Sequence, residues 1–151
     1  MPDSFLGLSE EDRAEALEQA SARSGRPAYL LEKDVWVVWA LSVLADRFGE
    51  ELVFKGGTSL SKAYGAIDRF SEDLDLTYDI RRLLSGEDGL APGKGDGLPP
   101  SGNKARQWTE KVRKRLPEWI DGEVIPLLET AIRNLGSVMQ IRRKSTEALY
   151  K

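Results

Sequence analysis

The feature that most constrains the fold is a double-glycine turn between a short apolar run and a short helix. The run "ELVFK", residues 51–55, has the character of a strand and stops at Gly56 and Gly57. Residues 58–65 then show helical apolar spacing, and "DLDLTY", residues 73–78, alternates acidic and apolar side chains as a strand with one buried face does. The predicted order is strand, glycine turn, helix and adjacent strand.

Helices are predicted on both sides of this core. A first helix over about 9–23 begins at Ser9, which with Asp12 resembles a capping box, and a second helix covers about 29–48. Its residues Trp36 and Trp39 lie on the apolar face and are expected in the core. Two further helices are expected over 104–116 and 119–135, with Pro117 near the start of the second.

The 151 residues suffice for one domain with a hydrophobic core. We therefore predict an α+β (α/β-like) fold in which a small mixed sheet is covered by helices. Residues 1–50 form a helical part, 52–80 the core and 104–135 a second helical part. The segment 85–103 holds 6 of the 14 glycines and 3 of the 7 prolines, which predicts a flexible surface loop.

The composition restricts the chemistry. The chain contains no cysteine and no histidine, so disulfides, thiolate sites, imidazole bases and the usual zinc ligands are excluded. A bound metal would need oxygen ligands, which favours magnesium, manganese or calcium. The amino terminus is acidic and no window approaches the 18 apolar residues of a membrane span, so a cytoplasmic protein without membrane contact is expected.

The glycine turn is a candidate phosphate site. A strand that ends in Gly56, Gly57, Thr58 and Ser59 and leads into a helix directs backbone amides and two hydroxyls beyond the strand end. Glycine allows a phosphate to approach the backbone closely. A tight turn without a ligand is the alternative, and the motif is neither a Walker loop nor a dinucleotide fingerprint.

Two carboxylates on the following strand are a candidate metal site. Asp73 and Asp75 are two residues apart and so project from the same face of a strand. At about 7 Å, two like charges repel by roughly 2 kcal/mol in an effective dielectric of 20. In a cleft this repulsion favours a bridging cation, whereas on an open strand face water is sufficient. A metal there would lie where a triphosphate held by the glycine turn could meet it.

The segment "FKGGTSLSKAYGAIDRFSEDLDLT" resembles the core motif of the AbiEii/AbiGii toxin family, which are nucleotidyltransferases of the DNA polymerase β type. The upstream "LEKDVWVVWAL" is similar to the helix before the first strand in that family. The resemblance is strong over about 28–80 and loose over 104–135. It implies that Asp73 and Asp75 are catalytic metal ligands for Mg²⁺ or Mn²⁺.

The same resemblance implies nucleotide-binding residues. Gly56, Gly57, Thr58 and Ser59 would contact the phosphates of a nucleoside triphosphate, and Lys62 and Arg69 would position it. Lys62 has the alternative of a solvated helix lysine. Arg69 has the alternative of an ion pair with Glu72 or Asp73.

One departure from the family pattern concerns the third carboxylate on a later strand. Nothing after Met139 has the character of that strand, so the chain is expected to be truncated or to hold an incomplete catalytic set. The resemblance implies a bacterial type IV toxin–antitoxin or abortive infection toxin that transfers nucleotide to an acceptor such as tRNA, with a cognate antitoxin.

Three alternatives accompany this interpretation. The segment "NKARQWTEKVRKR", residues 103–115, carries six basic residues and one acidic residue. It could contact an RNA backbone, or it could simply be a solvated helix face. The fold could also be an inactive module that binds nucleotide or protein. The same metal geometry would also allow phosphotransfer to a protein serine.

Overall fold

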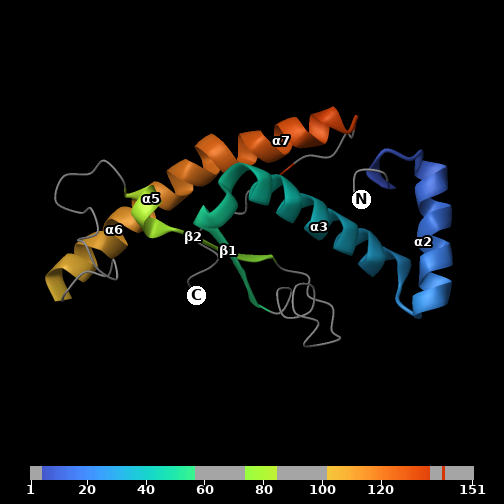
Figure 1. Ribbon diagram of the computed structural model, residues 1–151, viewed down its shortest axis with the longest axis horizontal. Helices are drawn as coiled ribbons and strands as arrows, with labels where there is room; N and C mark the ends of the chain where they lie inside the picture. Colours follow the sequence, from blue (N-terminus) through green and yellow to red (C-terminus); the bar gives the residue numbers. More distant parts are fainter. Residues whose placement is uncertain (1–4, 57–73, 85–101, 137–140, 142–151) are drawn as a thin grey trace.

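The computed structural model describes residues 5–56, 74–84, 102–136 and 141, and Figure 1 shows its elements. In chain order these elements are α2 (Glu10–Ser24), α3 (Ala28–Phe48), the 3₁₀ turn η1 (Gly49–Glu51), β1 (Leu52–Lys55), β2 (Asp75–Tyr78), α5 (Ile80–Leu83), α6 (Gly102–Trp119), the π-helical turn η2 (Ile120–Val124) and α7 (Ile125–Asn134).

The first helix, α2, begins and ends at residues suited to those positions. The Ser9 hydroxyl oxygen accepts the Asp12 amide at 3.1 Å, and the Ser9 hydroxyl donates to the Asp12 carboxylate at 2.7 Å. The helix ends at Gly25, whose φ of 70° is left-handed. The capping interaction predicted from the sequence is thus confirmed.

The main core lies between α3, α7 and the amino-terminal segment. Trp39 and Ile132 are buried together with Leu6, and Trp36 packs against this cluster. The rings of Trp36 and Trp39 meet edge to face at 5.6 Å. The expected core role of both tryptophans is confirmed.

The two strands form an antiparallel pair. Leu52 lies opposite Tyr78, and Lys55 lies opposite Asp75 at the other end of the ladder. The burial alternates along β1 and β2, so one face of the pair packs inward and the other faces solvent.

The carboxy-terminal helices differ from the sequence-based expectation. Pro117 lies inside α6, which runs through it to Trp119 and continues through η2 into α7. In Figure 1 these elements form one long arm that passes over α3. The predicted helix break at Pro117 was wrong. An internal proline costs about 3 kcal/mol, and the contacts of the following Trp119 with Phe48 and Tyr78 favour the continuous helix.

The α+β class holds at this level of detail, since helices surround a small two-stranded sheet. The mixed sheet that we expected is not seen among the described residues, where the strand pair is antiparallel. Across the described ranges, no helix has both the length and the apolar character needed to cross a bilayer. The division into parts remains a prediction.

Candidate functional site

The glycine turn and the acidic strand meet at one end of the strand pair. Gly56 follows Lys55, the residue paired with Asp75, and has a φ of 76°. A Cβ atom built on Gly56 would lie 2.8 Å from the Asp75 Cγ and 2.9 Å from its Cβ, and it would overlap the carboxylate oxygen Oδ2. The backbone of the turn therefore touches the Asp75 carboxylate, and a side chain at position 56 would displace it.

Asp75 is exposed and projects from the outer face of the sheet. Leu74 and Leu76 on either side of it are half-buried, which matches the alternation expected of the strand. Within the described part of the chain, no side chain forms an ion pair with Asp75. The exposed Asp75 side chain lies beside the Gly56 backbone.

The other predicted site residues lie outside the described residues. They are Asp73, the second carboxylate, and the phosphate-binding set Gly57, Thr58, Ser59, Lys62 and Arg69. In the described ranges, no group of three or more carboxylates lies close enough to hold a metal. The roles of these residues, and of Gly56 and Asp75, remain predictions.

Asp79, the last carboxylate of the acidic stretch, has a structural role. It caps α5, since its Oδ1 accepts the Arg81 amide at 2.9 Å, and its carboxylate also pairs with the Arg81 guanidinium at 2.7 Å. The hydrogen bonds from Arg81 hold the pKa of Asp79 below its usual range. Asp79 is therefore engaged locally and is a poor candidate for the metal.

A polar cluster that the sequence interpretation missed supports the opposite end of the strand pair. The Tyr78 hydroxyl donates to Glu51 Oε2 at 3.0 Å, and Arg82 Nε lies 3.1 Å from Glu51 Oε1. Burial, together with the hydrogen bond to Glu51, raises the pKa of Tyr78 to about 12. A signal was available, because Tyr78 is in phase with Leu76 and so faces inward, where a phenol needs a partner.

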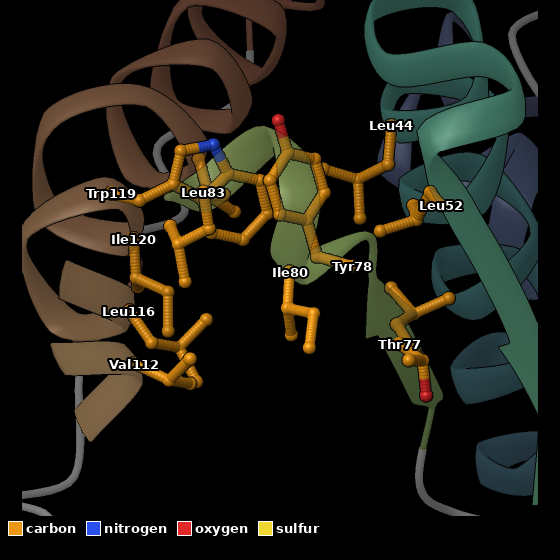
Figure 2. Close-up of a pocket in the computed structure, with 12 residues that line it drawn as sticks. Leu44, Leu52, Thr77, Tyr78, Ile80, Leu83, Val112, Leu116, Trp119 and Ile120 are labelled. Carbon is orange, nitrogen blue, oxygen red and sulfur yellow. The ribbon is translucent and has the colours of Figure 1, made fainter. Parts of the chain in front are cut away.

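Aromatic contacts join this cluster to the long helical arm. The Tyr78 ring stacks on Trp119 at 4.2 Å and 21°, and both rings contact Phe48. Figure 2 shows Tyr78 and Trp119 facing each other above an apolar hollow. These contacts fix the register of β2 and thereby the position of Asp75 three residues earlier.

The apolar hollow has a volume of about 440 Å³ and lies between the sheet, α5 and α6. Most of the side chains that Figure 2 labels around it are aliphatic, among them Leu52, Ile80, Val112 and Leu116. Such a lining does not suit a triphosphate, which needs cations and hydrogen-bond donors. The candidate site is thus the outer end of the strand pair.

A family model described as "Nucleotidyl transferase AbiEii toxin, Type IV TA system" matches residues 39–148. This range includes both strands, the Gly56 turn and the long helical arm. No curated protein and no solved structure matches the chain. The chain therefore belongs to the AbiEii family of nucleotidyl transferase toxins of type IV toxin–antitoxin systems.

Proposed function

We propose that this chain transfers a nucleotide from a magnesium-bound nucleoside triphosphate to an acceptor hydroxyl, with the 3′ end of tRNA as the acceptor. Such a modification would disable translation, so a cognate antitoxin would have to limit it. The observation that supports this proposal best is the contact between the Gly56 backbone and the Asp75 carboxylate.

The donor set at this contact fits a hard cation. Asp75 offers exposed carboxylate oxygens, the kind of ligand that magnesium and manganese bind. Asp73 and Asp75 would hold the metal together, and when bound it would supply positive charge to balance that of the triphosphate.

The chain's own residues would hold and orient the substrate. Gly56 leaves room for the Asp75 carboxylate beside the turn, Gly57 would let the triphosphate approach the backbone, and Thr58 and Ser59 would donate hydrogen bonds to its oxygens. Lys62 and Arg69 add positive charge around the leaving group. In the transfer, the acceptor hydroxyl oxygen bonds to the α-phosphorus, the bond from that phosphorus to the bridging oxygen breaks, pyrophosphate leaves and the hydroxyl proton passes to water.

The test is a labelling reaction with nucleoside triphosphates carrying ³²P at the α or the γ position, in the presence of Mg²⁺ and total tRNA. We expect α label on the RNA, its loss with chelator, and at least a hundredfold lower rate in Asp75→Asn. Asp79→Asn is the matched control, because it removes a carboxylate that caps α5 instead. Label from the γ position on protein would indicate phosphotransfer and would contradict the proposal.

A second candidate is a binding module without turnover. The sequence favours it, because no segment after Met139 has the character of the strand that carries the third carboxylate in the family pattern. Under this alternative the chain binds the Mg²⁺–nucleotide complex and Asp75→Asn weakens that binding, yet no label reaches RNA. Calorimetric titration beside the labelling assay distinguishes the two candidates.

A further inference from the structure

A lysine that the sequence interpretation missed lies directly across the strand pair from Asp75. In the antiparallel register Lys55 is the partner of Asp75, and the next pair along the ladder is Phe54 with Leu76. The members of this next pair are half-buried, whereas Lys55 and Asp75 are both exposed. The two charged side chains therefore project from the same outer face of the sheet, where paired residues have Cβ atoms about 4.5–5.5 Å apart.

The two charges do not form an ion pair with each other. Opposite charges at a cross-strand position attract, so a contact between them would be the simple expectation. The Asp75 carboxylate instead lies against the Gly56 backbone, where its Oδ2 occupies the space that a Cβ would take. Over the described ranges, no carboxylate pairs with the Lys55 ammonium. This ammonium, on a flexible four-carbon stem, is thus not committed to an acidic side chain there.

A positive and a negative charge side by side suit a ligand that itself carries both signs. A carboxylate attracts a metal ion and repels a free triphosphate, and an ammonium does the reverse. A metal–triphosphate complex can meet the carboxylate with its cation and the ammonium with its phosphate oxygens. The cross-strand pair of Lys55 and Asp75 therefore favours the complex over either of its components.

We propose that Lys55 binds a phosphate group of the metal–triphosphate complex beside Asp75 and makes this site prefer the complex to the free metal ion. This role rests on the proposed function, which supplies both the metal and the triphosphate. Lys55 is then a binding and selectivity residue, whereas Asp75 is the metal ligand. The alternative is a lysine that only keeps the outer face of the sheet solvated.

The test is calorimetric titration of the whole chain with two probes, Mn²⁺ alone and inorganic triphosphate in excess Mg²⁺. Inorganic triphosphate carries the charged part of the substrate, so the preferred base need not be known. Lys55→Met removes the charge and keeps the length of the side chain, and Lys55→Arg keeps the charge. Lys104→Met, at an exposed position on α6, is the control with the same change of net charge. Urea denaturation verifies that the variants are folded.

We expect Lys55→Met to move the two affinities in opposite directions. The affinity for the Mg²⁺–triphosphate complex should fall about tenfold, because a charge-assisted contact with a phosphate oxygen is lost. The affinity for Mn²⁺ alone should rise about threefold, because a like charge beside the metal is removed. Lys55→Arg should retain most of the affinity for the complex. Lys104→Met should change neither affinity by more than about twofold, since salt screens distant exposed charges.

Three results would overturn the role of Lys55. The first is an unchanged affinity of Lys55→Met for the complex, as expected of a solvated surface lysine. The second is an equal loss in Lys55→Met and Lys104→Met, which would show that net charge alone governs binding. The third is an affinity for Mn²⁺ that falls together with the affinity for the complex, because Lys55 would then act only by supporting Asp75.

The labelling reaction separates the role of Lys55 from the proposed function. Transfer of α label by the wild type, with unchanged binding of the complex by Lys55→Met, supports the enzyme and contradicts the role of Lys55. Weaker binding of the complex by Lys55→Met, with no transfer of label by the wild type, supports the role of Lys55 and contradicts nucleotide transfer.

Discussion

Two independent constraints favour glycine at position 56, and both concern the Cβ atom that any other residue would carry. Its φ of 76° lies in the left-handed region, which costs another residue roughly 1–2 kcal/mol. The Asp75 carboxylate also fills the space that a Cβ would take. Gly25 shares the first reason, with a φ of 70°, and lacks the second, because nothing lies within 4 Å of its Cβ position.

Gly56→Ala should therefore lower the free energy of unfolding by at least about 1 kcal/mol more than Gly25→Ala, since overpacking adds about 1–3 kcal/mol to the backbone cost. Urea denaturation measures both. In the double variant Gly56→Ala/Asp75→Gly the loss should be smaller than the sum of the single losses, because the overlapping atoms are gone. Additive losses, or equal losses at the two glycines, would refute the contact.

Tyr78 makes the stability of the folded protein depend on pH. Its pKa in the folded protein is raised to about 12, above the ordinary value near 10, so the native state holds the phenol proton more tightly than the unfolded chain. The stabilisation is complete below pH 10 and disappears as the pH rises through 12.

Between pH 10 and 12, the free energy of unfolding of the wild type should accordingly fall more steeply than that of Tyr78→Phe. The phenylalanine keeps the ring that stacks on Trp119 and removes the hydrogen bond to Glu51. Titration of lysines affects both proteins equally, so the difference between the two curves reports the titration of Tyr78. Parallel curves would show that the phenol does not titrate as the structure indicates.

At the scale of elements, the arm of α6, η2 and α7 connects the two halves of the core. Trp108 of α6 packs with Leu84, whereas Ile132 of α7 packs with Trp39. A π-helical turn closes its hydrogen bonds over one residue more than an α-helical turn. The turn therefore adds a residue without changing the side of α7 that faces α3.

Deletion of Gly122, which is exposed within this turn, should convert it to α-helix and keep Ile132 in the core. Deletion of Glu129, exposed on α7, should instead rotate Ile132 out of the core by about 100° and cost about 2–5 kcal/mol, as the loss of a large buried side chain does. Chemical denaturation of the two deletion variants measures the free energy of unfolding that each deletion costs. A deletion of Gly122 that is as costly as that of Glu129 would contradict this account of the turn.

The elements show what could be predicted from the sequence and what could not. The cap at Ser9 and the alternation around Asp75 follow from local rules of a few residues, and the structure has both. The passage of α6 through Pro117 goes with contacts between Trp119 and the distant residues Phe48 and Tyr78, which no local pattern reveals. The partnership of Tyr78 with Glu51 spans 27 positions and arises only once β1 and β2 pair.

Across the whole molecule, acidic and basic residues are unevenly distributed along the sequence. Residues 1–53 carry 5 basic and 11 acidic groups, a net −6, whereas residues 99–151 carry 11 basic and 6 acidic groups, a net +5. The arm of α6, η2 and α7 belongs to the positive part of the sequence, and Asp75 on β2 lies between the two parts in chain order. Under the proposed function this asymmetry would orient the tRNA toward the positive part before any close contact forms.

The proposed function requires that the Gly56 turn and Asp75 form one metal-binding pocket, a claim that can be tested by paramagnetic broadening with Mn²⁺ in a ¹⁵N-labelled sample. We predict that low concentrations of Mn²⁺ broaden the amide signals of Gly56 and Asp75, leave those of α2 sharp, and have no such effect in Asp75→Asn. Gly56 and Asp75 signals that stay sharp in the wild type, or equal broadening in Asp75→Asn, would contradict the claim.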